Sequence, residues 1–205
     1  YVLIGAAGRD TIYGGGGNDS LWGGGMTDLI WGDAGNDTLF GDGGDDVILG
    51  EAGGDRIMAG DGNDRIWGDA GRDVINGGLG NDVIFAVGGD GDDIVHGDEG
   101  TDTVNYEEGT GAWLIDLDAG IARSTEAGED ALSGIENAIG GRGANTFYAN
   151  DAANVLTAGS GHDTFVFRTA ADANGDTIEG FQAGDTISLT SIFGSAPTVQ
   201  AGAFN

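Results

Sequence analysis

The chain has 205 residues with 44 Gly, one Pro and no Cys, and its formal net charge is −28. A charge of this sign and size argues against nucleic acid or an anionic membrane as a partner, and it favours bound cations because excess carboxylates repel one another in a compact state. The lack of cysteine excludes disulfides and thiolate metal sites, and it fits an extracellular protein that folds without oxidation. No apolar run reaches about 18 residues, so no transmembrane helix is predicted, and no signal peptide is recognised.

A nine-residue repeat starts at Gly5 and continues to Asn105. Its eleven copies have Gly at positions 1 and 4 with few exceptions, Asp at position 6 in every copy, and Ile, Leu or Val at position 8 in every copy. Ala86 and Val87 interrupt the register once. Turn preference explains a single aspartate but does not demand a fixed spacing. The spacing therefore indicates a repeat architecture.

Each copy of the repeat predicts one short strand and one turn. Three residues, such as 20–22, form the strand with the middle side chain inward and its neighbours outward, and the six residues before them reverse the chain. Two copies then complete one coil, and successive coils stack about 4.8 Å apart. The predicted fold is all-β, a parallel β-roll (a β-solenoid) of nonapeptide repeats with a C-terminal capping region.

Stacked coils would place the position-6 aspartates in two rows, one starting with Asp10 and Asp28 and the other with Asp19 and Asp37. Like charges about 5 Å apart repel unless a cation lies between them. Ca²⁺ accepts roughly 6–8 oxygen ligands in irregular geometry, and glycine turns allow backbone carbonyls to face the ion. The predicted calcium ligands of this block are Asp10, Asp19, Asp28, Asp37, Asp46, Asp55, Asp64, Asp73, Asp82, Asp93 and Asp102.

The predicted core is a single aliphatic column in each sheet. At about 1.5–3 kcal/mol per buried side chain, it is thin against the ordering cost of a glycine-rich chain. We therefore expect the roll to be disordered without calcium and to fold on binding it. Alternate copies can pair to form at most about nine inter-coil sites, and nine Ca²⁺ would change the net charge from −28 to about −10. The two columns are Ile12, Ile30, Ile48, Ile66 and Ile84, and Leu21, Leu39, Ile57 and Ile75.

The template resembles the RTX nonapeptide G-G-x-G-x-D-x-U-x, in which U is a large aliphatic residue. The resemblance is strong over residues 5–105. It implies a calcium-binding parallel β-roll that carries several ions and is part of a secreted bacterial protein.

Residues 106–139 break the repeat and are predicted to form a β insertion, because "AWLIDLD" at 112–118 alternates as a strand does. A looser second block at 140–167 has Asn145, Asn154 and Asp163 at position 6. Asn is a neutral and weaker calcium ligand, so only Asp163 is predicted to bind metal here. The Asn side chains can instead hydrogen-bond along the stack.

Residues 168–205 are predicted to hold a C-terminal cap and a possible secretion region. The segment "NGDTIEGFQAGDTISL" at 174–189 resembles the capping segment of serralysin-type metalloproteases and related secreted enzymes. The resemblance implies export by type I secretion machinery, whose substrates carry an uncleaved C-terminal signal. The tail at 194–205 has no feature that identifies such a signal.

Catalytic motifs are absent from the sequence. It contains neither the H-E-x-x-H of zinc proteases nor the G-x-S-x-G of lipases, and it has no Lys for a P-loop. His96 and His162 occupy variable repeat positions and are predicted to be surface residues. We expect no enzyme activity in this chain. The parent protein can still be a secreted protease, lipase or polysaccharide-modifying enzyme with its catalytic part upstream.

Position 9 of the repeat is often aromatic and should point outward. Tyr13, Trp31, Trp67 and Phe85, with Leu49 between them, would form a contiguous apolar stripe, which usually marks an interface. An upstream domain, the C-terminal segment and a polysaccharide remain possible occupants. The main functional prediction is an extracellular calcium-loaded module that supports type I secretion and folding of a secreted protein. The alternative is a carbohydrate-binding or adhesion module.

Overall fold

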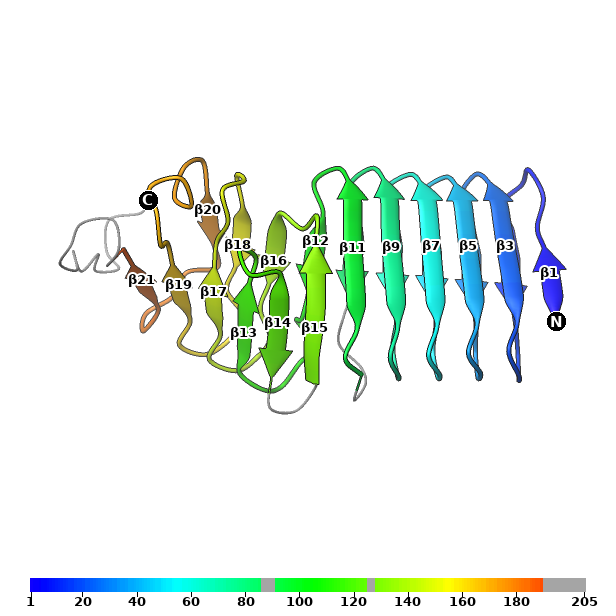
Figure 1. The fold of residues 1–205 in the computed structure, drawn as a ribbon, viewed down its shortest axis with the longest axis horizontal. Helices are drawn as coiled ribbons and strands as arrows, with labels where there is room; N and C mark the ends of the chain where they lie inside the picture. Colours follow the sequence, from blue (N-terminus) through cyan, green and yellow to red (C-terminus); the bar gives the residue numbers. More distant parts are fainter. Residues whose placement is uncertain (86–90, 125–127, 190–205) are drawn as a thin grey trace.

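The chain folds as an all-β solenoid. The computed structural model describes residues 1–85, 91–124 and 128–189, and these contain strands and turns but no helix. Two sheets lie face to face, and the chain passes from one to the other as it advances along the roll (Figure 1). The predicted parallel β-roll is confirmed. Within the described residues, no helix could cross a membrane.

The two sheets have twelve and nine strands. The twelve-stranded sheet contains, in spatial order, β1 (Val2–Ile4), β3 (Ser20–Gly25), β5 (Thr38–Gly43), β7 (Arg56–Asp61), β9 (Val74–Leu79), β11 (Ile94–Glu99), β15 (Gly128–Ser133), β14 (Ile121–Ser124), β13 (Trp113–Asp116), β17 (Thr146–Tyr148), β19 (Thr164–Val166) and β21 (Thr186–Ser188). The nine-stranded sheet contains β2 (Thr11–Tyr13), β4 (Leu29–Trp31), β6 (Val47–Leu49), β8 (Arg65–Trp67), β10 (Val83–Phe85), β12 (Thr103–Asn105), β16 (Asn137–Ile139), β18 (Val155–Thr157) and β20 (Thr177–Glu179).

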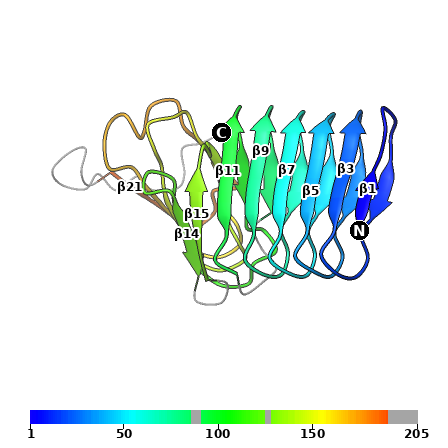
Figure 2. The same cartoon turned by 45° about the vertical axis from the view of Figure 1, so that its right-hand side comes forward.

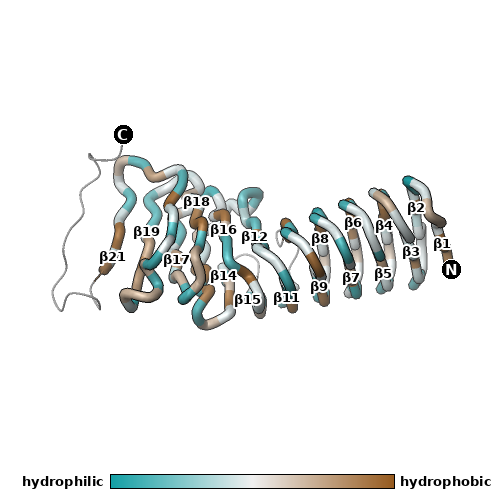
Figure 3. Tube along the Cα trace, turned by 90° about the horizontal axis from the view of Figure 1, so that it is seen from above, coloured by the Kyte–Doolittle hydropathy of each residue, from teal (hydrophilic) through white to brown (hydrophobic). Residues whose placement is uncertain are grey.

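The strand register confirms that two repeats make one coil. Leu21 pairs with Leu39, and Ile30 pairs with Ile48, an offset of 18 residues in both sheets. The offset grows to 20 where β9 pairs with β11 and β10 with β12, because the chain between them includes two extra residues. Those two residues, Ala86 and Val87, lie outside the described residues, as do residues 190–205 with the tail of the predicted secretion region. Figures 2 and 3 show the N-terminal coils stacked one after another along the roll.

Strand length differs between the two sheets. The prediction of three-residue strands is right for the nine-stranded sheet of the repeat but wrong for β3, β5, β7, β9 and β11, which have six residues each. In these strands the pairing continues into the turn, where Gly24 pairs with Asp42 and Gly25 with Gly43. Equivalent turn residues of successive coils share a positive φ, as Gly24 and Asp42 do, so adjacent turns can pair as strands do.

The core is the predicted pair of aliphatic columns. Their side chains are fully buried, except that Ile12 in the first coil keeps 8% of its surface exposed. In coils of this size the two columns pack directly against each other. Each strand of a coil therefore buries about one aliphatic side chain. The roll therefore has little apolar surface to bury beyond what the sequence pattern shows.

The C-terminal part departs from the simple coil. β13, β14 and β15 are antiparallel neighbours, and they are inserted between parallel strands of the twelve-stranded sheet. Residues 128–139 rejoin the stack, because β15 pairs in parallel with β11 and β16 pairs in parallel with β12. This part has a larger core, with the rings of Tyr106, Trp113, Phe147 and Phe165 buried.

Candidate metal centre

The position-6 aspartates form two rows, as predicted. In each row, the backbone N–H of one aspartate donates to Oδ1 of the aspartate one coil further along, for example from Asp28 to Asp46 at 2.8 Å and from Asp37 to Asp55 at 2.7 Å. The first aspartate row is Asp10, Asp28, Asp46, Asp64, Asp82 and Asp102. The second aspartate row is Asp19, Asp37, Asp55, Asp73 and Asp93.

The second carboxylate oxygen of most of these residues has no partner. Oδ2 is buried and accepts no hydrogen bond from the described residues in Asp19, Asp28, Asp37, Asp46, Asp55, Asp64, Asp73, Asp82, Asp102, Asp163 and Asp176. A buried carboxylate oxygen without a donor costs free energy, because it loses its water and gains nothing in return. A cation between the coils would remove that cost.

The position-1 glycines open a small space beside unpartnered oxygens of the rows. A Cβ atom at Gly23 would lie 2.5 Å from Asp28 Oδ2 and 2.9 Å from the carbonyl oxygen of Gly41 in the next coil. At Gly50 the same two distances, to Asp55 Oδ2 and the Gly68 carbonyl, are 2.5 and 2.7 Å. A carboxylate oxygen and a backbone carbonyl thus face the same space in successive coils.

This donor set fits calcium. It consists of oxygen atoms only, and Ca²⁺ is a hard cation that takes carboxylate and carbonyl oxygens. Among the described residues, no three His, Cys, Asp or Glu side chains gather at one point, so backbone carbonyls have to complete the coordination.

Several buried carboxylates of the two rows have a raised pKa in the metal-free chain. Burial, helped by the charges of neighbouring aspartates, raises the pKa of Asp46, Asp64 and Asp73 to about 7. The same causes raise the pKa of Asp55 and Asp102 to about 6. A bound cation favours the ionised form of these carboxylates, so it would compete with protons for them.

Comparison with protein families identifies the repeat. The model of the RTX calcium-binding nonapeptide repeat matches residues 2–25, 22–57, 49–84, 85–111 and 130–165, together well over half of the chain. The chain belongs to the RTX calcium-binding nonapeptide repeat family. RTX repeats bind Ca²⁺, are typical of secreted proteins, and are structural rather than catalytic, so this chain binds several calcium ions. A search of curated proteins found no match.

Two predicted ligands differ from the other RTX aspartates. Asp10 lies in the first coil, where its Oδ2 accepts a hydrogen bond from the N–H of Ala6 at 2.8 Å. Asp93 is buried and its Oδ1 accepts the N–H of Asp73, but its Oδ2 is not among the buried unpartnered oxygens. Asp163, in the second block, does have a buried unpartnered Oδ2.

The rows also include residues that the sequence analysis did not select. Asp130 and Glu136 accept the N–H groups of Asp93 and Asp102, and so continue the two RTX rows past the insertion. Further along, Asp176 accepts from Asn154 and Asp185 accepts from Asp163. Asp130, Asp176 and Asp185 each start a four-residue stretch with the D-x-U-x ending of the template, which was the available signal: DALS, DTIE and DTIS.

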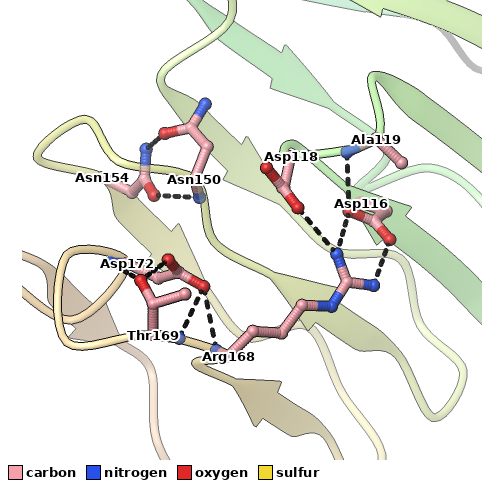
Figure 4. A network of polar contacts seen from close by, with 8 residues as sticks. All are labelled: Asp116, Asp118, Ala119, Asn150, Asn154, Arg168, Thr169 and Asp172. Carbon is pink, nitrogen blue, oxygen red and sulfur yellow. Dashed lines mark hydrogen bonds and ion pairs between the residues drawn. The ribbon is translucent and has the colours of Figure 1, made fainter. Parts of the chain in front are cut away.

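In the C-terminal part, an arginine side chain pairs with one acidic cluster. The Arg168 guanidinium donates to both carboxylate oxygens of Asp116, at 3.1 and 2.7 Å, and to Asp118 at 3.1 Å (Figure 4). It also lies over the ring of Tyr148, 4.1 Å from the centroid. This arginine ties the β13–β14 turn to the end of β19 by charge-assisted hydrogen bonds.

We predict that Gly41→Val weakens calcium binding. A Cβ at Gly41 would lie 2.4 Å from both Asp46 Oδ2 and the Ala59 carbonyl, so a branched side chain would displace the two oxygens. Ala59 shows that a single methyl group is accommodated at position 1 of another copy. Overpacking of about 1–3 kcal/mol corresponds to a loss of affinity of about 5- to 150-fold, measurable by calorimetric titration.

Gly43→Val is the matched control. A Cβ at Gly43 meets no atom within 4 Å, and the residue belongs to the same coil. Equal calcium affinity of the two variants would contradict a site at the position-1 glycine.

Proposed function

We propose that the unpartnered Oδ2 atoms of the two aspartate rows, together with carbonyls of adjacent coils, hold Ca²⁺ between the coils of an extracellular β-roll module. The buried, donorless oxygens, repeated along both rows, are the observation that carries this proposal. Bound calcium supplies the positive charge that the described residues lack at these points. The residues we assign are those that the sequence predicts, Asp10, Asp19, Asp28, Asp37, Asp46, Asp55, Asp64, Asp73, Asp82, Asp93, Asp102 and Asp163, with Asp176 in addition.

The proposed role of the loaded module is to fold outside the cell and to support type I secretion of the protein that carries it. A chain with net charge −28 and no cysteine is suited to stay unfolded where calcium is scarce and to fold without oxidation where it is abundant. The last strands, β20 and β21, end the two sheets, and this position supports a capping role for residues 168–189. Its serralysin-like character, and an upstream catalytic domain, stay predictions.

The test of the sites is an ion count. Asp64→Asn keeps an oxygen for the N–H of Asp46, which is 2.7 Å from Asp64 Oδ1, but replaces one carboxylate oxygen by an amide. Equilibrium dialysis should then find at least one Ca²⁺ fewer than in the wild type. Asp45→Asn is the control, because it removes the same charge at an exposed position in the adjacent coil. An unchanged count in Asp64→Asn would refute the assignment.

The carbohydrate-binding alternative depends on the aromatic stripe. The geometry of the stacked rings does not favour this alternative. Trp67 and Phe85 stack at 4.1 Å with an interplanar angle of 3°, and Tyr13 and Trp31 stack at 4.7 Å and 14°. Sugar rings pack on open aromatic faces, whereas these faces cover each other across neighbouring strands. We propose that the stripe stabilises the outer surface of the sheet, as cross-strand aromatic pairs do.

Trp67→Ala is therefore expected to lower stability rather than glycan binding. Loss of the stacked pair should cost about 1–2 kcal/mol in saturating calcium, seen as a lower Tm. Retention on immobilised acidic and neutral polysaccharides should not change. A variant with unaltered Tm that loses retention shown by the wild type would restore the carbohydrate-binding alternative.

A further inference from the structure

The hydrogen bonding of the second carboxylate oxygen changes in the aspartate rows after β12. Asp130 continues the second aspartate row, and its Oδ1 accepts the N–H of Asp93 at 3.2 Å. Its Oδ2, however, accepts a hydrogen bond from the Tyr106 hydroxyl at 3.0 Å. Both side chains are buried, with 1% and 0% of their surface exposed. The oxygen that is donorless in the preceding coils has a protein donor here.

Tyr106 stands where the repeat has glycine. Counting on from the last complete copy, residues 97–105, it occupies position 1 of the next copy. In the preceding coils this position leaves space beside an aspartate of the second row, as Gly50 does beside Asp55. The phenol fills that space, and Trp113 stacks on it at 4.0 Å. Burial and the Asp130 charge raise the pKa of Tyr106 well above its usual value, so the hydroxyl keeps its proton.

Asn145 also places a protein hydrogen-bond donor beside a row position, in this case its side-chain amide. A Cβ at Gly140 would lie 2.7 Å from Asn145 Nδ2, the place that Asp28 Oδ2 takes beside Gly23. Nδ2 donates to the carbonyl of Gly141 and to Asp163 Oδ1, both at 2.9 Å. A donor at this point satisfies the carbonyl and the carboxylate directly. It therefore takes the place of a cation between the two acceptors.

Asn154 repeats the arrangement in the other sheet. Its Nδ2 donates to the Glu136 carbonyl at 2.7 Å and to Asn150 Oδ1 at 2.9 Å, and its Oδ1 accepts the N–H of Asn150 (Figure 4). Tyr106, Asn145 and Asn154 therefore place hydrogen-bond donors at three points of the stack after β12. We call these three residues the donor seam.

We propose that the donor seam excludes Ca²⁺ from its coil interfaces, so that these residues decide where along the roll calcium binds. The ions are then confined to the coils from Asp10 to Asp102 and to the end that holds Asp163 and Asp176. This inference rests on the proposed function of the aspartate rows. It makes Asp130 a buried row member that is not a calcium ligand, although it has the same local sequence pattern as the ligands.

The first test compares two aspartates of the same row by counting bound Ca²⁺ in equilibrium dialysis. Asp73 has a buried donorless Oδ2, whereas Asp130 has Tyr106. Asp73→Asn should lose at least one ion. Asp130→Asn should bind as many ions as the wild type, because its amide can accept from Asp93 and donate to the Tyr106 oxygen. A loss in Asp130→Asn equal to that in Asp73→Asn would overturn the inference while the proposed function stands. A wild-type chain that binds no calcium would overturn both.

The second test creates a site. Asn145→Asp replaces the Nδ2 donor by an oxygen next to the Gly141 carbonyl and Asp163 Oδ1, which reproduces the oxygen-lined space of the loaded coils. We expect one additional bound Ca²⁺ and a Tm in EGTA below that of the wild type. An unchanged ion count in this isosteric variant would overturn the inference.

Discussion

Removal of Ca²⁺ with EGTA is expected to unfold residues 5–105 and to abolish most of the β signal in far-UV circular dichroism, and re-addition of calcium should restore it. Each nine-residue repeat buries one aliphatic side chain, which contributes about 1.5–3 kcal/mol, while ordering its backbone costs about 1–2 kcal/mol per residue. The backbone hydrogen bonds of the coils contribute further, but buried, donorless carboxylates such as those of Asp46 and Asp64 act against the fold. Calcium converts these groups from a cost into the main stabilising contact.

The cation in this experiment has to be varied to separate coordination from simple charge screening. Mg²⁺ demands near-octahedral geometry at about 2.0–2.1 Å and retains its water, so it should not restore the β signal at equal concentration. Asp64→Asn should shift the calcium midpoint to higher concentration, and Asp45→Asn should leave it unchanged. A chain with the same spectrum in EGTA and in calcium would contradict folding on calcium, and would mean that the aliphatic columns and the C-terminal core suffice.

The N-terminal half of the molecule could be predicted from the sequence because every contact there repeats. A fixed spacing of nine residues determines which side chains stack, so both aspartate rows and both aliphatic columns follow from it. The six-residue strands could not be predicted in this way. They depend on pairing between turns such as Gly24 with Asp42, and turn residues carry no hydrophobic pattern.

The C-terminal half could be predicted less well because its decisive contacts join residues at irregular separations. The antiparallel strands β13 and β14 separate Asp93 from its row neighbour Asp130 by 37 residues, which hides the repeat although the D-x-U-x ending is present. The bond from Tyr106 to Asp130 spans 24 residues, and the pair Arg168–Asp116 spans 52. Neither separation is a multiple of the repeat, so only the folded structure reveals these partners.

Lowering the pH is expected to supply part of the stabilisation that calcium gives to the fold. Burial raises the pKa of Asp46, Asp64 and Asp73 to about 7 in the folded chain, far above the ordinary aspartate value of 3.8 to which they return on unfolding. Between these two values the folded state binds more protons than the unfolded state, so the free energy of unfolding of the metal-free chain rises as the pH falls. Above pH 7 all of these carboxylates are ionised, and this stabilisation is lost. The calcium-loaded form should respond in the opposite direction, because protons compete with the ion for the same oxygens.

The measurement is far-UV circular dichroism of the EGTA-treated chain from pH 8 to pH 5, which stays above the sequence pI of about 4.1. The β signal should increase as the pH falls below about 7, because the carboxylates whose pKa is raised to about 6 or about 7 then take up protons in the folded state. Asp64→Asn carries no charge at this point of the row, so its metal-free form should gain β signal at a higher pH than the wild type. The calcium concentration at half-folding, measured in parallel at pH 8 and pH 6, should be higher at pH 6. A metal-free chain that loses structure as the pH falls would show that the row aspartates do not control folding through their burial, because proton uptake would then favour the unfolded state.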